Sequence, residues 1–193
     1  MKVENDNRKI TILWGITGSV GSVNIPNYLS EIMSKLNCQI ITIMTKASQN
    51  FLSPYIVELI TGRSVYRDMF LSIDGVKVPH IDLTKKADVF IVAPASANSL
   101  GKAANGVCDD LLSTSFIAYN NSIIFAPNMN EKMWNNKIVQ SNVEKLKSFG
   151  HIIIEPGEGI AISDGKANRG AMPGTEKILH IIRDYLEHRS LDQ

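Results

Sequence analysis

Val-Phe-Ile-Val-Ala-Pro-Ala-Ser-Ala-Asn, residues 89–98, and Ile-Ile-Phe-Ala-Pro-Asn-Met-Asn-Glu-Lys-Met-Trp, residues 123–134, decide the fold. Each stretch begins as an apolar run and then changes abruptly to small and amide side chains. A continuous apolar run predicts a strand buried on both faces, as in parallel sheets covered by helices. Ligands bind beyond the carboxyl ends of such strands, so the polar blocks mark a candidate binding edge.

The remaining sequence alternates between apolar β-branched runs and amphipathic segments. We expect strands over 9–16, 39–45, 88–93, 122–126 and 151–155, and helices over 23–36, 49–61, 99–104, 109–118, 137–149 and 175–188. Residues 63–79 show no clear period and are expected to form a loop with short pieces of structure. The alternation predicts an α/β fold, a three-layer Rossmann-like (flavodoxin-like) parallel sheet flanked by helices.

Length and composition indicate a single soluble domain over residues 1–193, with residues 1–8 expected to be disordered. The net charge of +1 gives no reason to expect nucleic acid as a partner. No apolar run suits a signal peptide or a membrane span, so we expect a cytoplasmic protein with no membrane partner. Cys38 and Cys108 lack zinc-type spacing and are expected to be reduced thiols, and we expect no metal.

A glycine-rich turn, Gly-Ile-Thr-Gly-Ser-Val-Gly at 15–21, follows the first predicted strand. Its spacing is not the dinucleotide fingerprint, and no acidic residue ends the second predicted strand, so a nicotinamide cofactor is disfavoured. A flavin phosphate, held by Gly18 and the hydroxyl groups of Ser19, Thr45 and Ser48, fits the turn better.

Together with His80 and Ala-Asn-Gly-Val-Cys-Asp-Asp-Leu-Leu at 104–112, the two polar blocks resemble the flavin-containing cysteine decarboxylases. That group includes phosphopantothenoylcysteine decarboxylase and the enzymes that oxidatively decarboxylate the C-terminal cysteine of lantibiotic precursor peptides. The resemblance runs from about Ile10 to the last predicted helix. It implies FMN as cofactor, with FAD possible, and a homo-oligomer, a trimer or possibly a dodecamer, with flavin sites at subunit contacts.

The resemblance also implies which residues line the flavin site. They are Gly18, Ser19, Thr45, Ser48, Pro94, Ala95, Ser96, Asn98 and Met133. For Ser96 and Asn98 an alternative stays open, because both are good helix N-cap residues.

His80 and Asn130 are the expected catalytic residues. The resemblance implies that His80 takes the thiol proton of the substrate or orients its carboxylate. It also implies that Asn130 binds the carboxylate without neutralising it. The expected substrate-binding residues are Asn128, Asn130, Ile162, Ser163 and Arg169. Residues 156–174, rich in glycine and without an apolar period, are expected to form a substrate-binding loop, the alternative being a mobile surface loop.

The chemistry implied by the resemblance explains the need for a flavin. Oxidation of the cysteine side chain to a thioaldehyde places a C=S bond β to the carboxylate, where it takes up the electrons released with carbon dioxide. Flavin N5 accepts the hydride. The product is an enethiolate.

The loop near the C-terminus distinguishes the two branches. Phosphopantothenoylcysteine decarboxylases carry a cysteine there, which protonates the enethiolate and returns the flavin to its starting state. Residues 160–165 contain no cysteine, and residues 166–170 resemble the substrate clamp of the lantibiotic enzymes. We therefore expect flavin-dependent oxidative decarboxylation of the C-terminal cysteine of a ribosomally made precursor peptide to an aminoenethiol. Phosphopantothenoylcysteine decarboxylation is the alternative, and a flavin prenyltransferase or an inactive regulatory subunit is disfavoured.

Overall fold

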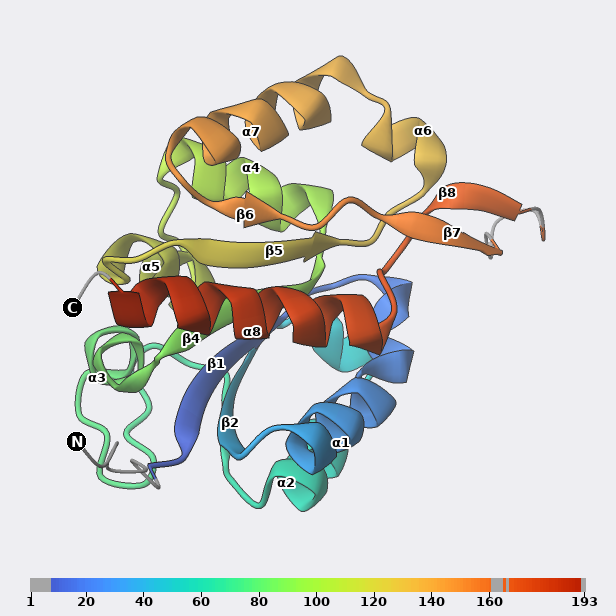
Figure 1. Ribbon diagram of the computed structural model, residues 1–193. Helices are drawn as coiled ribbons and strands as arrows, with labels where there is room; N and C mark the ends of the chain where they lie inside the picture. The colour runs from blue at the N-terminus through green and yellow to red at the C-terminus, as the bar shows by residue number, and fades with distance from the viewer. Residues whose placement is uncertain (1–7, 161–164, 166, 192–193) are drawn as a thin grey trace.

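A six-stranded parallel sheet forms the centre of the computed structural model, which describes residues 8–160, 165 and 167–191. The strand order is β3-β2-β1-β4-β5-β6 (Figure 1). The strands are β1 (Ile10–Ile16), β2 (Cys38–Met44), β3 (Val65–Tyr66), β4 (Val89–Ala95), β5 (Ile123–Pro127) and β6 (Ile152–Ile153). The order reverses between β1 and β4, which opens a crevice at the carboxyl ends of these strands.

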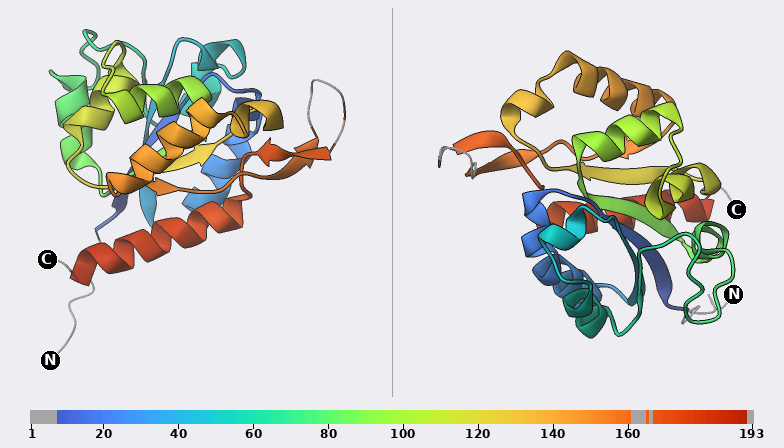
Figure 2. Two further views of the ribbon diagram at one scale, coloured as in Figure 1. Left: turned by 90° about the horizontal axis from the view of Figure 1, so that it is seen from above. Right: turned by 180° about the vertical axis from the view of Figure 1, so that it is seen from behind.

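Helices cover both faces of the sheet (Figures 1 and 2). One face carries α1 (Ile25–Lys35), α2 (Pro54–Thr61) and α8 (Thr175–Leu191). The other carries α3 (Pro79–Lys86), α4 (Ala97–Asn105), α5 (Leu111–Ala118) and α7 (Lys137–Ser148). Short helices η1 (Val20–Asn24), η2 (Ser48–Asn50) and α6 (Glu131–Trp134) follow β1, β2 and β5. The predicted three-layer α/β fold is confirmed.

Two apolar clusters, one on each face, make up the core. On the α4–α5 side the ring of Phe90 lies 5.8 Å from that of Phe116 and 5.5 Å from that of Tyr119, centroid to centroid. On the α8 side Trp14 is fully buried and donates its indole N–H to the carbonyl of Ala93 at 2.7 Å. Burying one large apolar side chain contributes roughly 1.5–3 kcal/mol, so these two clusters are a main source of the stability of the sheet.

The structure corrects the expectation of a loop over 156–174. Strands β7 (Gly157–Ile160) and β8 (Ala167–Ala171) pair antiparallel into a hairpin that projects from the body of the molecule (Figure 2). Its short strands bury no continuous apolar face, and therefore hydrophobic periodicity could not signal them.

The region over 63–79 is a loop with short pieces of structure, as expected. It includes β3, and α3 begins at its last residue, Pro79. The carboxylate of Asp82 accepts hydrogen bonds from the backbone N–H groups of Lys77 and Val78, at 3.0 Å each, which satisfies donors ahead of the helix. Proline is well suited to a first helical turn, yet α3 is short and largely polar, so it lacked a periodic apolar signal.

Other boundaries shift by a few residues. Helix α2 begins at Pro54 rather than residue 49, because η2 occupies 48–50, and the last strand shortens to Ile152–Ile153. The expected disorder concerns residues 1–7, which lie outside the described residues, and Arg8, which is described and pairs with Asp88 at 2.5 Å. No helix in the described part of the chain is long and apolar enough to cross a membrane.

Candidate active site

Two adjoining cavities lie at the carboxyl edge of β1, β4 and β5. Cavity A, about 420 Å³, is lined among others by Thr17, Gly18, Thr45, Ala47, Ser96, Asn98, Lys102, Asp110 and Met133. Cavity B, about 520 Å³, is lined among others by Gly18, Ser19, Gly21, Asn24, Ser96, Asn128, Asn130, Met133, Gly159 and Gly170. Gly18, Ser96 and Met133 line both, so the two cavities share a wall.

Cavity A is built by three loops that approach closely. A Cβ on Gly18 would stand 2.5 Å from the Cβ of Ala47, and glycine is required where these two loops meet. The hydroxyl of Thr17 donates to the carbonyl of Pro94 at 2.6 Å and accepts from the N–H of Ser96 at 2.9 Å. The glycine turn and the Pro-Ala-Ser-Ala-Asn block are thereby fixed against each other.

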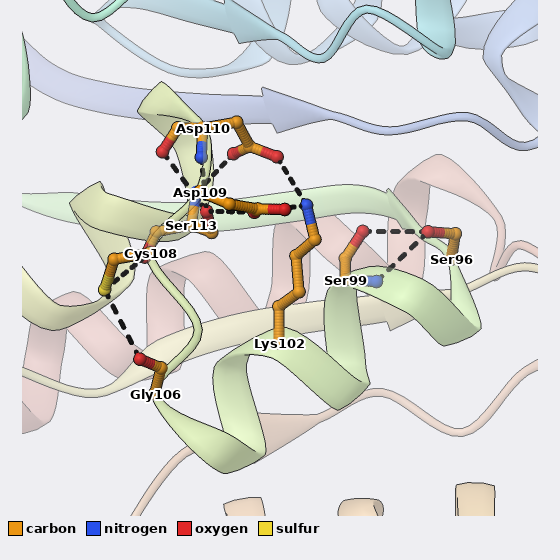
Figure 3. A network of polar contacts seen from close by, with 8 residues as sticks. All are labelled: Ser96, Ser99, Lys102, Gly106, Cys108, Asp109, Asp110 and Ser113. Atoms are coloured by element: carbon orange, nitrogen blue, oxygen red, sulfur yellow. Dashed lines mark hydrogen bonds and ion pairs between the residues drawn. The ribbon is translucent and has the colours of Figure 1, made fainter.

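Lys102 and Asp110, which line cavity A, belong to an ion cluster with Asp109; Figure 3 shows the contacts of this cluster. Lys102 reaches from α4 to Asp109 and Asp110, with Nζ–carboxylate distances of 2.5 and 2.8 Å. Partial burial by itself would lower the pKa of Lys102, but its hydrogen bonds to both aspartates raise the pKa above the usual value. Asp110 also caps α5 in a reciprocal pair with Ser113. Lys102 therefore stays a cation. The Cys-Asp-Asp block at 108–110 does not by itself reveal this contact.

Five of the nine residues expected to hold a flavin line cavity A: Gly18, Thr45, Ser96, Asn98 and Met133. Ser96 also caps α4, since its hydroxyl accepts from the N–H of Ser99 at 3.3 Å, so the capping alternative holds for Ser96 as well. Asn98 lies inside α4 and is not its cap.

The other four expected flavin residues have different surroundings. Ser19 lines cavity B, and its hydroxyl donates to Asn128. Ser48 is fully buried, and its hydroxyl donates to the carbonyl of Thr45 at 2.7 Å. Pro94 and Ala95 end β4 and contribute backbone carbonyls to hydrogen bonds from Thr17 and Asn128. Ser19 and Ser48 were expected to bind a phosphate because they carry hydroxyl groups, but the residue type does not reveal where a hydroxyl group points.

Cavity B gathers part of the expected substrate site. Asn128 and Asn130 line it at the end of β5, and Asn130 caps α6 by accepting from the N–H of Lys132 at 2.9 Å. Arg169 is on β8, pairs with Glu155 at 3.2 Å and does not line the cavity. Ile162 and Ser163 lie outside the described residues.

His80 is not brought together with Asn130 within one chain. It lies in the first turn of α3 and lines neither cavity. Its Nδ1 is buried and has no hydrogen-bond partner among the described residues. A buried ring nitrogen of this kind costs free energy unless a partner or ligand satisfies it.

Both cysteines lie outside the linings of cavities A and B. Cys38 is buried at the start of β2, at the opposite edge of the sheet, and burial raises the pKa of its thiol to about 11. Cys108 is exposed and donates weakly to the carbonyl of Gly106 (Figure 3). Within the described residues no three His, Cys, Asp or Glu side chains are grouped to hold a metal.

Known proteins resemble the whole chain. The Flavoprotein family model matches residues 1–187. Mersacidin decarboxylase of Bacillus sp. (strain HIL-Y85/54728) is 36% identical, covering 91% of both chains. A probable phosphopantothenoylcysteine decarboxylase of Streptococcus mutans is 33% identical, covering 91% of this chain and 98% of its own.

Solved structures agree with these relatives. The FMN-dependent cysteine decarboxylase SpaF matches with a TM-score of 0.81 at 31% identity, over 93% of this chain and 98% of its own. A histidine-to-asparagine variant of EpiD, complexed with the substrate peptide DSYTC, matches with a TM-score of 0.79 at 27% identity, over 90% of this chain and 98% of its own. The resemblance read from the sequence is thereby confirmed, and the chain belongs to the Flavoprotein family and, within it, to the flavin-containing cysteine decarboxylases.

Proposed function

We propose that this protein is an FMN-dependent peptidyl-cysteine decarboxylase, with the flavin in cavity A and the C-terminal cysteine of a peptide in cavity B. The small residues and hydroxyl groups of cavity A suit a flat ring and a phosphate, and no metal is required. The hydroxyl of Thr45 and the amide of Asn98 provide polar contacts, while Gly18 and Ala47 leave room for close approach. FMN, named for SpaF, is the flavin proposed here.

In the proposed reaction the substrate loses carbon dioxide and two hydrogens. The thiol gives up a proton and Cβ gives up a hydride, so that a C=S bond forms. The Cα–carboxylate bond then breaks, and its electron pair makes the Cα=Cβ bond of the enethiolate. FMN, when bound, would supply the hydride acceptor, with oxygen as the terminal oxidant.

The chain's own residues would bind and orient the substrate. Asn130, which lines cavity B, would donate from its amide to the substrate carboxylate. An amide holds a carboxylate without giving it a proton, and therefore carbon dioxide can leave. Gly159, Gly170, Ala171 and Met172 form the wall of cavity B contributed by the hairpin and the residue after it, and they would shield the reacting end from water.

The position of the cysteines supports a peptide substrate over phosphopantothenoylcysteine. Neither Cys38 nor Cys108 lines cavity A or B, and these are the only cysteines in the chain. Within one chain, therefore, no thiol lines the site to protonate the enethiolate and reverse the flavin reduction. We therefore propose that the reaction stops at the oxidised product.

We also propose that a neighbouring copy completes the site. His80 does not line either cavity, and in the segment that precedes it Phe70, Leu71 and Val78 expose 89, 51 and 45% of their surface. A second chain seated there would bury these side chains and would bring its cavities to His80. The trimer expected from the resemblance is the simplest such assembly.

The substrate can be identified by product mass. The purified protein is incubated in air with a peptide ending in free cysteine and, separately, with phosphopantothenoylcysteine. Loss of carbon dioxide and two hydrogens from the peptide supports the proposal. Loss of carbon dioxide alone, from phosphopantothenoylcysteine and not from the peptide, would place the protein in coenzyme A synthesis.

A further inference from the structure

Asn128 joins the two walls of cavity B. Its side-chain oxygen accepts hydrogen bonds from the backbone N–H of Gly21 at 3.0 Å and from the hydroxyl of Ser19 at 2.5 Å. Its side-chain nitrogen donates to the carbonyl of Gly170 on β8 at 3.0 Å. One amide thus connects the glycine turn after β1 to the hairpin.

The packing around this amide is tight. A Cβ on Gly21 would stand 2.5 Å from Asn128 Oδ1, and a Cβ on Gly170, whose φ is 151°, would collide with the carbonyl of Met129. The carbonyl of Gly170 also accepts from the N–H of Met129 at 3.1 Å. Asn128 is only 9% exposed, and both polar atoms of its side chain already have partners, which makes it a poor group for binding a substrate.

We infer that Asn128 is a positioning residue, which sets the separation between the glycine turn and the hairpin and so holds the hairpin over the substrate bound by Asn130. This inference rests on the proposed function and gives Asn128 a different role from the substrate ligand expected from the sequence. Linking the glycine turn to the hairpin requires an acceptor and a donor on the same carbon atom, and the amide of asparagine supplies both. The hydrogen bond to Gly170 joins the segment after β5 directly to β8.

Asn128→Asp separates the two contacts. The carboxylate still accepts from Gly21 and Ser19, but it sets an acceptor against the carbonyl of Gly170. We expect hydrogen exchange at the Met129 amide to accelerate, because its acceptor moves away with the hairpin. We expect KM for a peptide ending in cysteine to rise about tenfold, because one hydrogen bond is lost and two oxygen acceptors then face each other. We expect kcat and FMN affinity to stay within about twofold of the unmodified protein.

Asn24→Asp is the matched control. Asn24 lines the same cavity, is exposed and makes no capping hydrogen bond, so its variant adds the same charge without altering the link to the hairpin. Exchange at Met129 should stay as in the unmodified protein. If Asn128→Asp matches Asn24→Asp in exchange and in KM, the inference is wrong.

Asn128→Ala gives a second test without added charge, and it applies if the aspartate variant does not fold. It removes both contacts, and therefore the amides of Gly21 and Met129 should both exchange faster. Unchanged protection at both amides would overturn the inference. Because exchange is measured without substrate, a protein that rejects every cysteine peptide would refute the proposed function and leave this result standing.

Discussion

At the scale of single residues, the two cysteines have opposite environments. Cys38 is buried with its pKa raised to about 11, so its thiol stays protonated at neutral pH and is shielded. Cys108 is exposed. We predict that iodoacetamide at pH 8 modifies Cys108 and leaves Cys38 intact in the folded protein, as read by peptide mass spectrometry. Flavin content and turnover should survive, and modification of Cys38 at a comparable rate would contradict the placement.

His80 carries the second prediction at this scale. It lines neither cavity, so His80→Asn should bind FMN with unchanged affinity and visible spectrum. If its imidazole accepts the thiol proton, turnover of a cysteine peptide should fall by about 100-fold or more. Stopped-flow absorbance and product mass check both statements. Turnover equal to that of the unmodified protein would remove His80 from the mechanism.

At the scale of elements, His151 links β6 to β5. Its Nδ1 accepts from the N–H of Ile123 at 3.2 Å, and its ring packs edge-on against Phe125 at 5.9 Å. Burial lowers the pKa of His151 below its usual 6.5, so the folded protein prefers the neutral ring. The unfolded chain therefore takes up a proton first as pH falls, and the stabilisation present above about pH 6.5 is lost below it.

Urea unfolding at pH 7.5 and pH 5.5 tests this linkage. The unmodified protein should lose part of its free energy of unfolding at the lower pH, and His151→Gln should lose less. His188→Gln is the control, because His188 is exposed on α8. Equal losses in the unmodified protein and in His151→Gln would show that the half-buried ring of His151 does not titrate in this range.

The elements also differ in how well the sequence predicts them. The buried strands were foreseen because burial on both faces leaves continuous apolar runs, as in β4. Helix α3 was missed because it is short and mostly polar, and the β7–β8 hairpin because it has no apolar face. Ser19 and Ser48 were chosen as phosphate donors by residue type, yet their hydroxyls bond within the protein. The contact of Lys102 with Asp110 depends on how α4 and α5 meet, which no local pattern reveals.

At the scale of the whole molecule, α2 leaves an apolar face without a partner in the single chain. Phe51, Tyr55, Ile56 and Leu59 expose 43, 66, 44 and 65% of their surface. Phe51 lies just before α2, and large exposed apolar side chains that follow one another along a segment are typical of a protein contact. We predict sedimentation at the mass of a trimer or a multiple of it, and Leu59→Glu should reduce any assembly beyond the trimer. A fully active monomer at micromolar concentration would contradict the proposed shared site.

The oxidative character of the reaction is the central claim, and anaerobic single turnover tests it most directly. Protein with bound flavin is mixed without oxygen with an equal amount of a peptide ending in cysteine, while flavin absorbance and peptide mass are followed. We predict that the yellow colour bleaches in proportion to the peptide that loses carbon dioxide and two hydrogens. Decarboxylation that leaves the flavin oxidised at the end of the reaction would contradict the account.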